Sequence, residues 1–242
     1  MNQSQGSGGS DGMAAAGPPR DATPARRPLR LAARLVSAGQ RQAINSALAS
    51  GRVRRVESVD LLAPARLPAL ARQSLILLLV SGAAFLALDL AARAAHPDAA
   101  PVASASPITI VGLVAGNLVL YIAILPLHEA VHAATILALG GRPRFGLRLP
   151  LALYCTAPYH IFTRAGYAAV ALAPLVALSV AGATVIWLAP NAGAYLLFAL
   201  AGNASGAVGD LASVTVLRRL PMGALIADTA TGFDAFALDA PA

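Results

Sequence analysis

Apolar residues form long runs after residue 70, and four of these runs have the length of a membrane-crossing helix. They lie at about 70–91, 108–139, 166–188 and 193–217. A helix of about 20 apolar residues spans the roughly 30 Å hydrocarbon core of a bilayer, so the pattern predicts four transmembrane helices. The second run exceeds this length, so its helix must tilt or protrude.

A short break separates the third run from the fourth. Pro190 and its neighbours are the only residues between them, so the two helices are predicted to form a tight antiparallel hairpin. The predicted fold class is therefore an all-α integral membrane protein with about four transmembrane helices. Its apolar, four-helix domain extends over residues 70–217.

The segments before the first run are polar and basic. Residues 1–28 are rich in Gly, Ser, Pro and Arg, and we predict that they form a disordered tail. They contain no apolar core, so we expect the first run to act as an uncleaved insertion signal. Residues 29–69 form a basic juxtamembrane region.

Residues 29–60 show a helical rhythm of aliphatic residues and arginines. Two interpretations fit this rhythm: an amphipathic helix lying on an anionic leaflet, or a solvated basic linker. Within it, residues 53–62 are compatible with a short strand. After the last run, residues 218–242 contain three aspartates and no base beyond Arg219, which predicts an acidic C-terminal tail.

The composition excludes a soluble globular protein. Hydrophobic residues make up 57% of the chain and charged residues 12%, against about 45–50% and about 25% in soluble domains. A net charge of +7 would suggest nucleic acid as the partner of a soluble protein. Because the arginines cluster beside the apolar runs, membrane topology explains them instead. The expected partners are membrane lipids and a membrane protein or peptide substrate, and no nucleic acid.

The arginines also predict the orientation of the chain. Eleven of the 18 basic residues lie at or before Arg72, four lie within the loop 140–165, and two follow the last run. The positive-inside rule places these segments on one side when both termini are cytoplasmic, which agrees with an even number of crossings. We therefore expect a multi-pass protein of the bacterial inner (plasma) membrane.

The second run contains the pattern H-E-x-x-H, at His128, Glu129 and His132. Positions i and i+4 share one helical face, so both imidazoles can meet one metal ion. Glu129 can then reach a water molecule as general base. Imidazole ligands suit zinc, so one Zn²⁺ per chain is the expected cofactor. Cys155 is the only cysteine, which excludes an internal disulfide and a thiolate cluster.

A structural interpretation of the same residues is a polar cluster in which Glu129 hydrogen-bonds a neighbouring helix. Ionisable groups at membrane depth are costly and usually functional, and this cost favours the metal site. A catalytic zinc also needs a third protein ligand and an open position.

Asp210 is the candidate third ligand, because it is the one carboxylate well inside the fourth run. His132 and Asp210 each lie seven residues before the end of their run, which is about 10 Å along each helix. The two side chains are therefore expected at one level. The alternative for Asp210 is an interfacial aspartate that is solvated or paired with Arg218 or Arg219.

Three further features bear on this site. Gly202 and Gly206 form G-x-x-x-G, which allows close helix packing. Asn203 lies on much the same face as Asp210, where it would orient substrate, hydrogen-bond a metal ligand or join helices. His160, in the loop before the third run, is either an alternative ligand, a substrate contact or an ordinary interfacial residue.

Together, His128-Glu129-x-x-His132 in an apolar helix and Asn203 to Gly209-Asp210 in a later one resemble the membrane-embedded putative zincin peptidases. This bacterial group is similar to the site-2 proteases, whose Asn-to-Asp spacing is longer and ends in Asp-Gly. The Gly-Asp order here favours the looser zincin-like group. The resemblance covers about 108–217 and implies that His128, His132 and Asp210 bind zinc and that Glu129 is the base.

The sequence therefore predicts an intramembrane zinc metallopeptidase whose site opens toward the cytoplasmic half of the bilayer. Glu129 would take a proton from water and pass it to the leaving amine. Two alternatives belong to other classes. One is a metal-binding membrane protein without hydrolysis, such as a transporter or sensor, and the other is a structural membrane protein without metal.

Overall fold

Four long apolar helices form the body of the computed structural model, which describes residues 30–32, 36–99, 106–148 and 152–238. The predicted tail at 1–28 lies outside the described residues. The helices are α2 (Leu67–Ala95), α3 (Pro107–Ala138), α4 (Arg164–Leu188), and α6 (Leu197–Gly206) followed by α7 (Val208–Leu217). All four units are long and apolar enough to cross a membrane, which is consistent with a membrane protein.

Local signals explain where these helices begin. Ser106 and Thr163 cap α3 and α4, and their hydroxyl groups accept hydrogen bonds from backbone N–H groups three residues later. The helix α3 continues through Pro126. The short helix α5 (Pro190–Gly193) lies at the predicted turn between the third and fourth units. The outer helix faces are apolar and exposed, as at Leu79, where lipid can cover them.

The all-α expectation is wrong, because the described residues also form β-strands. A five-stranded sheet has the order β1-β5-β6-β7-β2. Its strands are β1 (Arg30–Leu31), β5 (His160–Thr163), β6 (Leu225–Thr229), β7 (Gly232–Leu238) and β2 (Val53–Asp60). Only the β1–β5 pairing is parallel. A separate hairpin consists of β3 (Arg144–Arg148) and β4 (Ala152–Thr156).

The sheet joins the segment that precedes the apolar helices in the sequence to the segment that follows them. The strand expected within 53–62 is confirmed as β2, and the helical rhythm before it gives α1 (Ala38–Ala49). The segment expected to be an acidic tail instead contains β6 and β7. Strand β7 pairs with β2 from Val53–Leu238 to Asp60–Gly232. A Cβ atom at Gly232 would overlap the carbonyl oxygen of Val59, so this close approach requires glycine.

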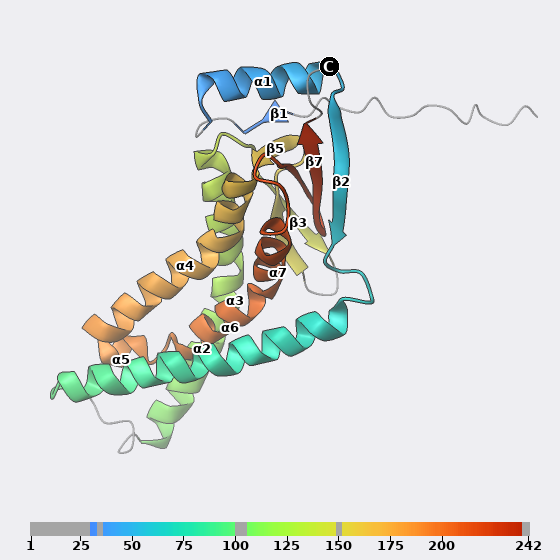
Figure 1. The fold of residues 1–242 in the computed structure, drawn as a ribbon. Coiled ribbons are helices and arrows are strands. Elements are labelled where there is room, and N and C mark those ends of the chain that lie inside the picture. The colour runs from blue at the N-terminus through green and yellow to red at the C-terminus, as the bar shows by residue number, and fades with distance from the viewer. Residues whose placement is uncertain (1–29, 33–35, 100–105, 149–151, 239–242) are drawn as a thin grey trace, which may run out of the picture.

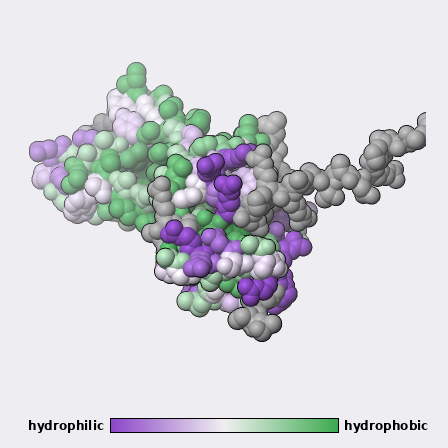
Figure 2. All heavy atoms as spheres, turned by 90° about the horizontal axis from the view of Figure 1, so that it is seen from above, coloured by the Kyte–Doolittle hydropathy of each residue, from purple (hydrophilic) through white to green (hydrophobic). Residues whose placement is uncertain are grey.

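A shared hydrophobic core fixes the sheet against one end of the helices. Phe233 of β7 and Ile226 of β6 are buried with Ile136 of α3, Tyr167 of α4 and Leu217 of α7. The sheet therefore lies beside the end of α3, the start of α4 and the end of α7, as Figure 1 shows. Seen from this end, hydrophilic side chains gather around the centre of the view and at its left edge, and hydrophobic side chains cover most of the surface between them (Figure 2).

Helix α6 is surrounded by the other long helices. Its residues Ala199–Ala204 are all buried. A second core cluster joins Leu200 to Ala92 of α2, Ile124 of α3 and Ile186 of α4. The hydroxyl groups of Ser74 on α2 and Ser205 on α6 lie 2.7 Å apart. Since α6 leads directly into α7, this central packing determines where the first turn of α7 is placed.

Candidate metal centre

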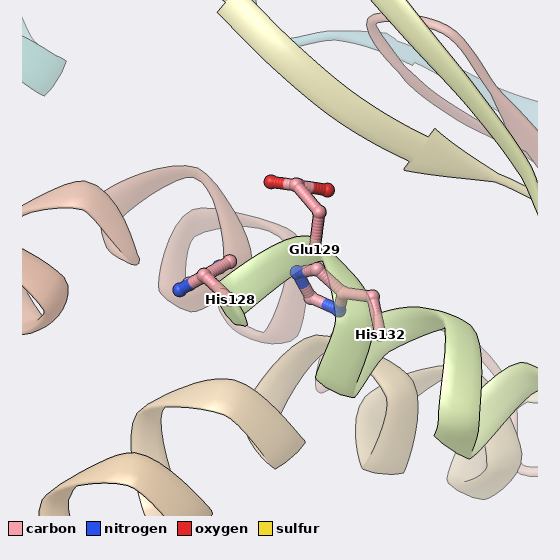
Figure 3. A group of neighbouring side chains, drawn as sticks. All are labelled: His128, Glu129 and His132. Carbon is pink, nitrogen blue, oxygen red and sulfur yellow. The ribbon is translucent and has the colours of Figure 1, made fainter. Parts of the chain in front are cut away.

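Helix α3 presents His128, Glu129 and His132 on adjacent positions of its surface (Figure 3). One ligand atom from each residue can be chosen so that all three lie within 4.8 Å of one another. The i, i+4 spacing produces this proximity, as the sequence pattern predicts. Glu129 points away from the helix toward the neighbouring strand, and one of its carboxylate oxygens remains within 4.8 Å of a ring nitrogen of each histidine.

Asp210, in the first turn of α7, contacts both histidines. Its Oδ2 atom lies 3.3 Å from Nε2 of His128, and its Oδ1 atom lies 3.6 Å from Nε2 of His132. The three side chains are 22%, 12% and 10% exposed, respectively. The N-terminal end of a helix favours a negative charge, so the start of α7 stabilises this carboxylate. The structure thus brings His132 and Asp210 together, as their equal distances from the ends of their apolar runs predict.

The Nδ1 atoms of both imidazoles form hydrogen bonds with carbonyl oxygens. His128 donates from Nδ1 to Oδ1 of Asn203 over 2.8 Å. His132 donates from Nδ1 to the backbone oxygen of Val170 on α4 over 2.9 Å. A carbonyl oxygen only accepts hydrogen bonds, so each Nδ1 carries a proton and each Nε2 is the atom left to bind a metal ion. Both Nε2 atoms face Asp210.

This donor set fits a zinc ion. Zinc bonds to nitrogen and oxygen of about 2.0–2.2 Å separate neighbouring tetrahedral ligands by roughly 3.3 Å. The Asp210–His128 and Asp210–His132 separations of 3.3 and 3.6 Å match this value. Two imidazoles and one carboxylate, each imidazole oriented by a second hydrogen bond, are ligands typical of catalytic zinc.

Asn203 is placed to orient His128 rather than to contact substrate. It is 2% exposed, and it is absent from the residues that line the neighbouring cavity. Within the described part of the chain, its amide nitrogen is buried without a partner. Its hydrogen bond to His128 is therefore the one polar contact that its side chain makes there.

A cavity of about 590 Å³ opens beside the histidines. Its walls come from the start of α2, from α3, α4 and α7, from β4, and from the turn between β6 and β7. Glu129, His128, His132 and Asp210 all line it. The cavity thus extends from the candidate metal centre to the sheet end of the molecule.

Two residues of this cavity were not found by sequence reasoning. The hydroxyl of Tyr167 donates to Oδ1 of Asp228 over 3.0 Å, and the backbone N–H of Ala157 donates to Oδ2 over 2.8 Å. Burial raises the pKa of the Asp228 carboxyl to about 6. Asp228 therefore fastens β6 to α4 and to the loop after β4. In the sequence, Asp228 lies in the segment predicted to be an acidic tail, and no motif there indicates that it joins these elements.

Cys155 of β4 lies across the cavity from α3. Its backbone N–H faces the Glu129 carboxylate. Burial, together with the nearby carboxylates of Glu129 and Asp228, raises the pKa of its thiol to about 12. The thiol is therefore neutral at physiological pH, and it acts as a small apolar wall of the cavity.

His160 is the one candidate that the structure does not bring to this site. It lies buried on β5, its Nδ1 is 3.2 Å from the oxygen of Pro158, and it does not line the cavity. Asp210 also differs from its interfacial alternative, since its ion-pair contacts in the described residues are with the histidines and not with Arg218 or Arg219.

Comparison with known proteins agrees with this arrangement. No curated protein and no solved structure matches the chain. Residues 121–225 match a family model. The matched segment runs from the middle of α3 to the first residue of β6 and includes His128, Glu129, His132, Asn203 and Asp210. The segment that holds the complete candidate metal centre thus matches the family described as "Putative zincin peptidase".

Proposed function

We propose that this protein is a membrane-embedded zinc metallopeptidase that cleaves peptide bonds in or beside the membrane. The observation that carries the proposal is the convergence of three ligands from two helices. Nε2 of His128 and Nε2 of His132 both face the carboxylate of Asp210, while Glu129 lines the cavity beside them and points toward the neighbouring strand. The match of residues 121–225 to the family described as "Putative zincin peptidase" supports the same conclusion.

The division of roles follows from the geometry. His128, His132 and Asp210 would hold the zinc ion. When bound, zinc polarises the scissile carbonyl and lowers the pKa of water to about 7. Glu129 takes a proton from the attacking water as the new carbon–oxygen bond forms. It then delivers that proton to the amine nitrogen as the carbon–nitrogen bond breaks.

The cavity supports a peptide as substrate. Its walls are mostly apolar, with Leu61, Leu70 and Leu153 among them, so an apolar peptide segment can lie against them. Its carboxylate and imidazole groups come from α3, from Asp210 on α7 and from Asp228 on β6. We further propose that the site faces the cytoplasmic side, because the arginine-rich segments lie at the same end of the helices as the sheet.

The experiment compares Glu129→Gln with Glu57→Gln in the detergent-purified full-length protein. Glu57 is the only other glutamate, and it lies exposed on β2. Zinc content is measured by elemental analysis, and cleavage is measured by mass spectrometry on a proteome-derived peptide library. We expect about one zinc per chain in all three proteins. Removal of a general base lowers the rate by about 100- to 10,000-fold, so only Glu129→Gln loses cleavage.

The other outcomes separate the remaining functions. Undiminished cleavage by Glu129→Gln would contradict the proposed mechanism. Stoichiometric zinc without cleavage in the wild type would favour a transporter or sensor. A wild-type protein that binds no zinc, even when zinc is offered, would leave the structural polar cluster as the explanation of His128 and His132.

A further inference from the structure

A second cavity, of about 540 Å³, lies between α2 and α7. Its long walls are apolar and come from both helices, as at Ile76 and Leu77 on α2 and at Leu211 and Val216 on α7. At one end it is bordered by two arginines, Arg66 and Arg219. We call this cavity the α2–α7 groove.

The two arginines are at the sheet end of the helices. Arg66 directly precedes α2, and Arg219 follows α7 by two positions. Both residues are exposed. Among the residues that the structure describes, neither guanidinium group forms a hydrogen bond or an ion pair, and the groove has no carboxylate in its lining. The mouth of the groove therefore carries two uncompensated positive charges.

The length of the groove suits one acyl chain. Along α2 it extends from Arg66 to Leu77, and along α7 from Arg219 to Val208, which is a rise of eleven residues in each case. At 1.5 Å per residue this is about 16 Å, and half of a hydrocarbon core of roughly 30 Å, which one acyl chain spans, is about 15 Å. An acyl chain that starts at the arginines is therefore long enough to reach the far end of the groove.

We propose that the α2–α7 groove binds one anionic phospholipid. The phosphate lies between Arg66 and Arg219, which offer planar, forked hydrogen-bond donors suited to phosphate. One acyl chain lies along the apolar walls. Basic pockets between membrane helices bind acidic headgroups in this manner, and the absence of a lining carboxylate leaves no partner for the cationic amine of a zwitterionic lipid.

The lipid site adjoins the candidate metal centre but uses none of its residues. The two cavities share three lining residues, Leu61, Leu70 and Val208. A lipid in the groove would therefore contact side chains that also line the cavity beside the histidines. The proposal does not depend on hydrolysis, because it rests on the groove and its two arginines alone.

Native mass spectrometry of the full-length protein tests this proposal, with phosphatidylglycerol and phosphatidylcholine of identical acyl chains as probes. We expect one tightly bound phosphatidylglycerol and at least tenfold weaker binding of phosphatidylcholine. The double variant Arg66→Gln/Arg219→Gln should lose at least tenfold in phosphatidylglycerol affinity. The matched control is Arg72→Gln/Arg218→Gln, which removes the same charge from the same two helix ends outside the groove.

A third variant distinguishes binding in the groove from attraction of the lipid to surface charge. Thr215 is exposed and lines the groove, so Thr215→Trp fills the space of the acyl chain and keeps both arginines. We expect it to lose phosphatidylglycerol while zinc content and gel-filtration behaviour stay unchanged. It also tests the proposal if the arginine variant fails to fold. Equal losses in the two arginine variants, or full binding by Thr215→Trp, would overturn the proposal.

Discussion

The Oδ2 atom of Asp210 lies 3.3 Å from Nε2 of His128, although the two residues come from different helices. Helix α6 carries the chain back to the level of the H-E-x-x-H motif, and the break at Ala207 starts α7 with Asp210 in its first turn. The proposed ligand set therefore depends on the packing of α6 as much as on the motif itself.

Replacement of Asp210 by asparagine should abolish tight zinc binding. The variant keeps the shape of the side chain but loses the negative charge that faces both Nε2 atoms. Loss of an outer-shell partner typically costs 10- to 100-fold in metal affinity, so loss of a direct ligand should cost more. Competition with a chromophoric chelator measures the affinity. The exposed Asp98→Asn serves as control, and unchanged affinity in Asp210→Asn would remove it from the ligand set.

Asn203→Ala should weaken zinc binding by about 10- to 100-fold, because it removes the carbonyl that orients His128. Asn117→Ala is a matched control. Asn117 joins α3 to the region around α6 through hydrogen bonds with Ala194 and Phe198, away from the histidines. Its loss should lower stability without changing zinc affinity. Equal zinc affinities in the two variants would show that Asn203 only holds the helices together.

The two glycines of G-x-x-x-G should respond differently to alanine. A Cβ atom at Gly202 would overlap the ring of Tyr121 on α3, whereas the space around Gly206 is open to 4 Å. Overpacking typically costs about 1–3 kcal/mol, so Gly202→Ala should lower the thermal unfolding temperature and Gly206→Ala should not. Differential scanning fluorimetry in detergent measures both. A lower unfolding temperature in Gly206→Ala alone would contradict the packing described for α6.

Cys155 should resist alkylation at neutral pH. Its thiol pKa of about 12 lies far above the usual value of about 8.5. Since the raised pKa disfavours the thiolate, the reaction rate with iodoacetamide should rise about tenfold per pH unit between pH 8 and 10 without levelling off. The unfolded chain, whose single cysteine reacts normally, is the control. Equally fast alkylation of the folded protein would show that the thiol is neither buried nor neutral.

The sequence predicts the helices and the proximity of His128, His132 and Asp210 well, because both depend on local patterns. The apolar runs, the i, i+4 histidines and the depth of Asp210 can be counted along the chain. The sheet cannot be found in this way, because its strands are short and come from distant, charged segments. Asp228 illustrates the difference, since only the burial of Ile226 and Phe233 brings it beside Tyr167.

The pairing of β2 with β7 has a consequence for the order of folding. Strand β2 precedes all four apolar helices and β7 follows them, so the sheet can close only after every helix has been synthesised. The turn between β6 and β7 lines the cavity beside Glu129. During synthesis the histidines are therefore present well before the cavity is complete, and the cavity is finished only once β7, which follows the last apolar helix, has paired with β2.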